Sequence, residues 1–120
     1  MSEFTDFIED VFREFGAIQC RKMFGGYGVY YHGAMFALIA EDVLYLKTDK
    51  TTAGYFQERD LPQFQYAREG KIYKMSYFQA PEEIFDDPAE AATVAKIAYA
   101  TALRSAAVKK PSRRKKTAAS

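Results

Sequence analysis

The feature that most limits the fold of this chain is a long β-rich stretch, residues 21–48. Tyr, Val, Phe, Leu and Ile crowd three short segments, which are separated by Gly33 and by the pair Glu41–Asp42, and this pattern predicts a β-meander. The segment Ala34–Ala40 is apolar throughout, as is typical of a central strand covered on most of its surface. The segment Val43–Lys47 alternates, which predicts one buried face and one wetter face. The core of the protein is therefore expected to be a sheet.

Helices are expected on both sides of this stretch. A first helix, with Ser2 as N-cap and Gly16 as terminator, is predicted by the helical spacing of Phe4, Phe7, Ile8, Val11, Phe12 and Phe15, a stripe expected to pack on the sheet. Asp87–Pro88 predicts the start of a last helix that runs to about Ala107. One side of this helix, made mostly of alanines, consists of Ala91, Ala95, Ala98, Tyr99, Ala102 and Ala106.

The remaining segments complete an α+β pattern. A strand over Ile18–Phe24 is expected to lead through a glycine-rich turn into the meander, and Asp49 is expected to cap a short helix that ends near Glu58. Phe64–Arg68 and Lys71–Phe78 predict a second hairpin. The order α-β-β-β-β-α-β-β-α predicts a two-layer sandwich of helices packed on a mostly antiparallel sheet of about five to six strands.

The charge of the chain is unevenly distributed. Six of its 17 basic residues lie in 109–120, which contains no acid, so residues 1–108 hold 11 bases against 16 acids. Such segregation is typical of a folded acidic domain with a disordered basic arm. We therefore expect a domain over 1–108 and a disordered basic tail over 109–120. The bases of this tail, a candidate nucleic-acid site, are Lys109, Lys110, Arg113, Arg114, Lys115 and Lys116.

Residues that carry catalytic or metal chemistry are sparse. His32 is the only histidine and Cys20 the only cysteine, which excludes a zinc site made of the usual nitrogen and sulfur ligands. A nucleophilic pair of these two residues would require them to be close in space. The run Gly26–Gly28 lacks the last glycine of a GxGxxG motif and leads into a strand, where a dinucleotide site needs a helix. We therefore predict no enzyme activity, no cofactor and no metal.

Basic residues and tyrosines interleave in and beside the predicted strands, a composition that suits stacking of nucleic-acid bases. The acidic balance of residues 1–108 argues against such a platform, because counter-ion release needs clustered positive charge. The tail is the stronger electrostatic candidate. The strand bases are Arg21, Lys22, Lys47, Lys50, Arg68, Lys71 and Lys74, and the tyrosines are Tyr27, Tyr30, Tyr31, Tyr45, Tyr66 and Tyr73.

Short motifs follow one another in a definite order along most of the chain. They begin with Arg21, Lys22, Met23, Phe24, Gly25, Gly26, Tyr27 and Gly28, continue through 36–40 and 44–47, and end with Phe64, Tyr66, Gly70, Met75, Tyr77, Pro81, Glu82 and Asp87–Pro88. No single motif is specific. The ordered set, which spans about residues 10–107, resembles the N-terminal domain of the TfoX/Sxy family, regulators of natural competence.

The resemblance implies a small α/β sandwich similar to secretion-chaperone-like folds, with no known enzymatic activity. Better-studied family members act as transcriptional co-regulators of competence genes together with the cyclic-AMP receptor protein. The resemblance therefore implies a regulatory interaction domain with a protein partner, such as a transcription factor. Weak nucleic-acid binding through the basic tail is the alternative. Such regulators usually carry a second, helical C-terminal domain, whereas this sequence continues into the basic tail.

The cellular location is predicted from a comparison of the sequence with membrane-spanning segments and secretory signals. No apolar run approaches the roughly 20 residues that cross a bilayer, and the acidic, amphipathic start differs from a secretory signal. We therefore expect a cytoplasmic protein without membrane contact. The alanine-rich helix and the open edges of the sheet suggest a homodimer.

Overall fold

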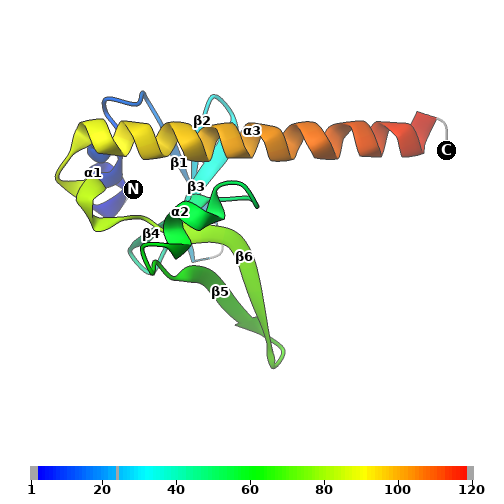
Figure 1. Ribbon diagram of the computed structural model, residues 1–120, viewed down its shortest axis with the longest axis horizontal. Helices are drawn as coiled ribbons and strands as arrows, with labels where there is room; N and C mark the ends of the chain where they lie inside the picture. The colour runs from blue at the N-terminus through cyan, green and yellow to red at the C-terminus, as the bar shows by residue number, and fades with distance from the viewer. Residues whose placement is uncertain (1–2, 24, 119–120) are drawn as a thin grey trace.

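The computed structural model describes residues 3–23 and 25–118, and their side chains as far as residue 107. Six strands form one antiparallel sheet in the order β1-β2-β3-β4-β6-β5 (Figure 1). The predicted α+β fold is confirmed. The strands are β1 (Gln19–Met23), β2 (Gly26–Tyr31), β3 (Ala34–Ala40), β4 (Val43–Lys47), β5 (Gln63–Arg68) and β6 (Lys71–Gln79). The helices are α1 (Glu3–Val11), α2 (Ala53–Gln57), α3 (Pro88–Ala118) and the short 3-10 helix η1 (Glu82–Phe85).

The core lies between the sheet and the helices. Phe36 of β3 is fully buried, and its ring lies 5.6 Å from that of Phe12, which follows α1. The buried alanines of α3, among them Ala91, Ala95 and Ala98, belong to the same cluster and let this helix approach the sheet closely. Burial of each large apolar side chain contributes about 1.5–3 kcal/mol, so this single cluster is the main source of stability.

The apolar run of β3 has a structural cause. Val29 of β2 pairs with Ala37, but Tyr30 pairs with Met35, so Phe36 is the extra residue of a β-bulge. Phe36 and Ala37 consequently both belong to the core cluster, together with Ile39. Strict alternation is lost at this point, and the segment reads as continuously apolar.

The β5–β6 hairpin projects away from the two-layer body. In Figure 1 it descends below the rest of the sheet, far from α3, and β5 forms one edge of the sheet. The hairpin is anchored at its base, where Gln63 Nε2 donates a hydrogen bond to the carbonyl oxygen of Met75 at 2.9 Å. From residue 65 to residue 74 every residue is exposed. The helices therefore leave this arm available to a partner.

The last helix begins as predicted and ends later than predicted. Asp87 Oδ1 accepts hydrogen bonds from the backbone N–H groups of Ala89 and Glu90, both at 3.1 Å, which confirms it as the N-cap. The helical backbone continues past Ala107 and Pro111 to Ala118, although the composition predicted disorder after residue 108. A proline removes one backbone donor and strains a helix without always ending it. The division into a domain over 1–108 and a tail over 109–120 stays a prediction.

The first helix, by contrast, ends earlier than predicted. Its regular part ends at Val11, and a turn carries the chain to Phe15, so Phe12 and Phe15 pack on the core from outside the helix. Gly16, with φ of 153°, follows as the expected break. The predicted N-cap Ser2 lies outside the described residues.

Candidate interaction surfaces

The glycine motif lies where β1 and β2 meet, and it has a packing role. Gly26 and Gly28 belong to β2 itself and not to the predicted turn, in which Gly25 is the described residue. A Cβ on Gly26 would collide with the carbonyl oxygen of Ile39 on β3. A Cβ on Gly28 would lie 2.9 Å from Met23 Sδ and 3.1 Å from Met35 Sδ. The glycines therefore allow β3 and the two methionines to approach β2.

The other motif residues lie on both faces of the sheet. Arg21 places its guanidinium carbon 4.9 Å from the ring centre of Tyr30, on the face opposite the helices. Tyr27 packs against the core cluster on the helix side. Gly25 occupies the turn with φ of 96°, and Phe24 lies outside the described residues. The motif thus builds a β-hairpin and brings no set of reactive groups together.

Cys20 is buried and His32 is exposed, so the two residues that a nucleophilic pair would need lie in different environments. Cys20 is buried in the core cluster, and this burial, with the nearby carboxylates of Glu9 and Asp6, raises the pKa of its thiol to about 11. His32 is exposed in the β2–β3 turn, where its ring contacts that of Tyr31 at 4.3 Å. A thiol with so high a pKa is a poor nucleophile near neutral pH. Among residues 3–23 and 25–118, no three His, Cys, Asp or Glu residues gather as metal ligands would.

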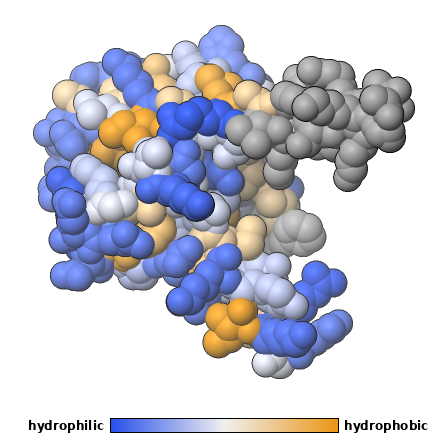
Figure 2. Space-filling view, turned by 45° about the vertical axis from the view of Figure 1, so that its right-hand side comes forward, coloured by the Kyte–Doolittle hydropathy of each residue, from blue (hydrophilic) through white to orange (hydrophobic). Residues whose placement is uncertain are grey.

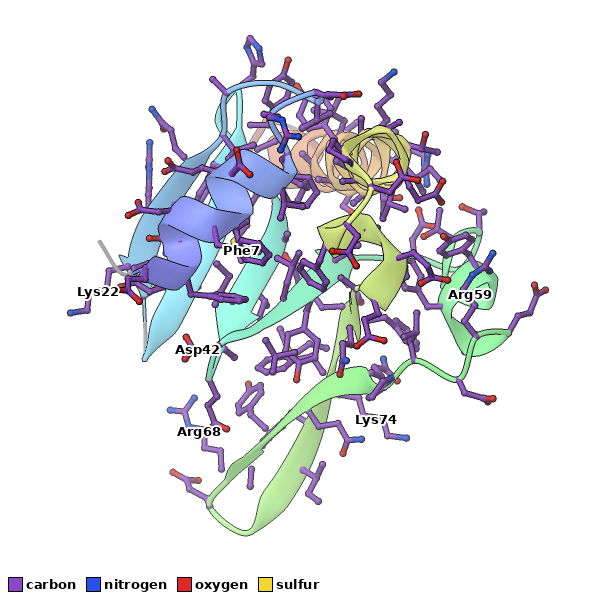
Figure 3. The ribbon with its side chains drawn as sticks, turned by 90° about the vertical axis from the view of Figure 1, so that its left-hand side faces the viewer. Phe7, Lys22, Asp42, Arg59, Arg68 and Lys74 are labelled. Atoms are coloured by element: carbon purple, nitrogen blue, oxygen red, sulfur yellow. The ribbon has the colours of Figure 1, made fainter. Side chains whose placement is uncertain are left out.

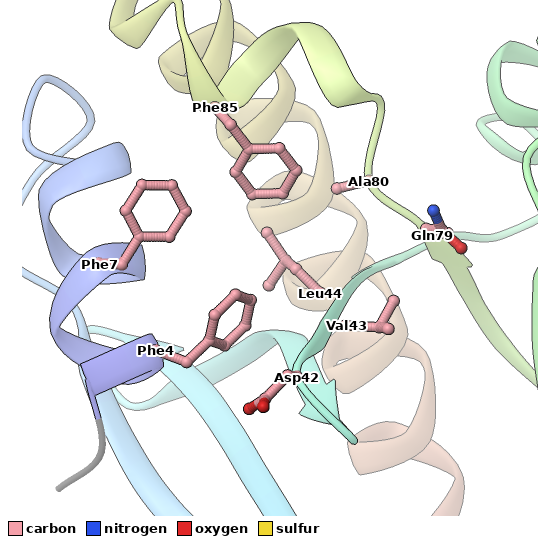
Figure 4. Close-up of a pocket in the computed structure, with 8 residues that line it drawn as sticks. All are labelled: Phe4, Phe7, Asp42, Val43, Leu44, Gln79, Ala80 and Phe85. Atoms are coloured by element: carbon pink, nitrogen blue, oxygen red, sulfur yellow. The ribbon is translucent and has the colours of Figure 1, made fainter.

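A hollow in the surface lies between α1, the start of β4 and η1 (Figure 4). Its volume is about 270 Å³, and its wall is mainly apolar. Pockets for drug-sized ligands hold about 300–1,000 Å³, so this hollow is sized for one or two side chains. It is lined by Phe4, Phe7, Asp42, Val43, Leu44, Gln79, Ala80 and Phe85.

Three phenylalanines from two segments form the upper wall of this hollow. The rings of Phe7 and Phe85 are stacked at 5.8 Å, and the ring of Phe4 lies 6.1 Å from that of Phe7. Phe7 remains 42% exposed. The prediction that the whole stripe of the first helix packs on the sheet is therefore wrong at this position, because the helix presents Phe7 to the rim of the hollow (Figure 3).

The rim of the hollow is acidic. Asp42 lies at its edge, and a second, more open depression of about 520 Å³ beside it is lined by Glu3, Phe4, Phe7 and Asp42. Further exposed carboxylates follow on α1 at Asp6, Glu9 and Asp10. An apolar floor with an acidic rim suits an apolar side chain that is flanked by basic residues. The sequence carried one signal of this site, the phenylalanines one turn apart at the chain start, but the partners from β4 and η1 come together only through the fold.

The bases of the predicted tail cannot be placed against any surface. The side chains of residues 109–120 lie outside the described part of the chain. Nucleic-acid binding by Lys109, Lys110, Arg113, Arg114, Lys115 and Lys116 therefore stays a prediction.

Comparison with known proteins identifies the family. The family model described as the TfoX N-terminal domain matches residues 10–102, which cover the sheet and the helix α3 as far as its last buried turn. The chain belongs to this family. The DNA transformation protein TfoX1 of Aliivibrio fischeri (strain ATCC 700601 / ES114) is 27% identical over 89 residues, which are 74% of this chain and 43% of that protein. This TfoX-family chain therefore matches less than half the length of that relative.

Within the described residues, no helix is both long and apolar enough to cross a bilayer.

Proposed function

We propose that this TfoX N-terminal domain is a non-enzymatic, cytoplasmic regulatory module that binds a protein partner and thereby co-regulates transcription of competence genes. Two observations support the proposal. The chain belongs to the TfoX N-terminal domain family, and the similar protein from Aliivibrio fischeri is named for DNA transformation. The exposed Phe7 beside an apolar hollow is the observation that carries the binding step.

The partner is a protein segment with an apolar anchor and basic neighbours. A hollow of about 270 Å³ accepts a side chain, and anchors of this kind carry most of the energy of an interface. Asp42 and Glu3 attract a basic segment and repel an acidic one. Transcription factors that hold DNA expose such basic segments.

Site-specific photo-crosslinking in the host bacterium tests this proposal. A photo-reactive phenylalanine analogue placed at residue 7 is expected to capture one defined protein through an apolar and basic segment. The matched control is the same analogue at Leu103, which is 46% exposed on α3 and distant from the hollow. In parallel, Phe7→Asp is expected to lower transformation frequency at least about ten-fold, whereas Leu103→Asp leaves it unchanged, because one buried anchor is worth more than about 1.4 kcal/mol.

Two results would count against the proposal. Equal capture at positions 7 and 103 would show that the hollow is not the docking site. A Phe7→Asp protein that folds normally, as judged by circular dichroism, and still supports transformation would exclude this surface from the function.

A further inference from the structure

The sheet has a second face, here called the open face, on the side away from the helices. Residues of α1, α2, η1 and α3 share one core cluster with Leu44 and Leu46 of β4, so these leucines point to the helix side. Because side chains alternate along a strand, Tyr45 and Lys47 lie on the open face. Lys47 pairs across the sheet with Tyr77, whose ring centre lies 5.1 Å from its ammonium nitrogen.

The open face continues onto the projecting hairpin as a row of aromatic rings. The ring of Tyr45 lies 4.9 Å from that of Phe64, and Phe64 lies 6.4 Å from Tyr66. Tyr66 is stacked on its cross-strand partner Tyr73 at 5.3 Å. Tyr66 and Tyr73 are 39% and 42% exposed, so the outer end of this row is available to a ligand. In Figure 2 the hairpin is the lower projection, whose surface is mostly hydrophilic around one hydrophobic patch.

The charges of the protein separate between the two layers. The six strands contain six basic residues and no Asp or Glu, whereas acids gather in α1, in η1 and before α3. Arg21 and Lys47 lie on the open face. Arg68 and Lys71 pair with each other two residues beyond the tyrosine pair and so continue that face. In Figure 3, Arg68 and Lys74 project to opposite sides of the hairpin.

This separation removes the main objection to a nucleic-acid platform. Of the 16 acids of residues 1–108, seven lie in helices, nine lie in turns and loops, and none lies in a strand, so the acidic total does not describe the sheet. Glu41 and Asp42 lie in the turn between β3 and β4, and Glu69 lies at the tip of the hairpin. α1 and η1, which hold six acids and no base between them, repel phosphates, whereas the bases of the open face attract them, and this orients a polyanion toward the aromatic row.

We propose that the open face and the β5–β6 hairpin bind single-stranded nucleic acid. Arg68, Lys71 and Arg21 contact phosphates, and Tyr66 and Tyr73 stack on unpaired bases. A second copy of the chain is a poor occupant, because a symmetric contact at the hairpin brings Arg68 and Lys71 close to the same residues of the other copy. Duplex DNA keeps its bases paired and offers no base faces to the rings. This site is separate from the hollow beside Phe7.

Fluorescence anisotropy with a labelled oligo-dT of about 16 nucleotides tests the proposal on the full chain. Tyr66→Leu with Tyr73→Leu is expected to weaken binding about five-fold or more, since one stacked base is worth at least about 1 kcal/mol. Tyr66→Phe with Tyr73→Phe retains the rings and is expected to retain the affinity. Both tyrosines are exposed, so these changes leave the core intact.

The dependence of binding on salt concentration distinguishes the bases of the sheet from the bases elsewhere in the chain. Lys71→Gln is expected to reduce the slope of log affinity against log salt by about 0.7, the value for one phosphate contact on a single strand. Lys96→Gln is the matched control, because Lys96 is an equally exposed lysine on α3, in the helix layer. Lys71→Gln and Lys96→Gln are also compared in a chain whose six tail bases are replaced by Gln. The smaller salt slope of Lys71→Gln is expected to persist there.

Several results overturn the proposal. Equal slopes for Lys71→Gln and Lys96→Gln would show that the bases act only through net charge. Loss of all binding in the chain without tail bases would assign the interaction to the tail. Duplex DNA that binds as tightly as oligo-dT, or poly-glutamate that competes equally well, would exclude base stacking. None of these results bears on crosslinking at Phe7, so the two surfaces are tested independently.

Discussion

Asp49 joins the loop after β4 to the last helix, and its removal should measurably destabilise the protein. Its Oδ1 accepts hydrogen bonds from the backbone N–H groups of Thr51 and Thr52, at 3.0 and 3.2 Å, and from the Thr51 hydroxyl at 2.7 Å. Its Oδ2 accepts two from the guanidinium of Arg104, at 2.9 and 3.1 Å. One carboxylate therefore caps the turn that enters α2 and pairs with Arg104 in the middle of α3.

The magnitude follows from these two roles. Loss of a side chain that caps backbone N–H groups costs about 1 kcal/mol. The ion pair adds at most about 1 kcal/mol, because the side chains of Arg104 and Asp49 are 49% and 28% exposed and solvent screens their charges. We expect Asp49→Ala to lower the free energy of unfolding by about 2 kcal/mol. Arg104→Ala, which spares the cap, should cost about 1 kcal/mol or less.

Urea unfolding followed by circular dichroism measures these differences, with Arg13→Ala as a control on the exposed pair between Arg13 and Asp10. The hydrogen bonds of Asp49 to Thr51, with the Arg104 guanidinium, hold the pKa of the Asp49 carboxyl well below its usual range. A carboxyl with a lowered pKa in the folded state stabilises the fold at pH values above its unfolded pKa of about 4. This contribution is lost as the pH falls further.

The pH dependence provides the decisive test. Asp49→Asn keeps an oxygen acceptor but carries no charge, so it should be less stable than the native chain at pH 7. The difference in free energy of unfolding between the native chain and Asp49→Asn should narrow as the pH falls below about 4. A gap that stays constant from pH 7 to about pH 3 would refute the assignment of charged hydrogen bonds to Asp49.

Two further predictions follow from buried positions. The Cys20 thiol, with its pKa raised to about 11, should resist a disulfide reagent at pH 8 in the folded protein and react at once in urea; rapid reaction of the folded chain would contradict its burial. Gly28→Ala should cost about 1–3 kcal/mol as the methionines shift, and Gly26→Ala should cost more because it meets the backbone at Ile39. Gly54→Ala, with open space around it, should be neutral or stabilising, and equal losses at all three glycines would refute the packing role.

Much of the secondary structure was predictable because its signals are local. Hydrophobic alternation in β4, the turn residues of the meander and the cap at Asp87 act between near neighbours in the chain. The ordered set of motifs over about residues 10–107 also identified the family correctly. The end of α3 was predicted less well, since Pro111 is a strong local signal for a break and the helical backbone nevertheless continues.

The candidate sites were harder to predict because they join distant segments. The hollow needs Phe7 from α1, Leu44 from β4 and Phe85 from η1, and periodicity alone assigned Phe7 to the core. The sequence argues against a platform of strand bases and tyrosines, because the net charge of residues 1–108 is acidic. Net charge is a sum over the chain, and it carries no information about the layer in which each charge lies.

The sequence by itself determined the α+β class, the antiparallel meander and the family, because periodicity, turn chemistry and motif order are properties of the linear chain. The tertiary structure decided which residues are accessible and which share a face. It left Phe7 at the rim of an apolar hollow edged by Asp42, and it placed Tyr66 and Arg68 on a projecting arm. It also placed Arg21, Lys47, Arg68 and Lys71 on one face of the sheet, because strand pairing brings distant residues together.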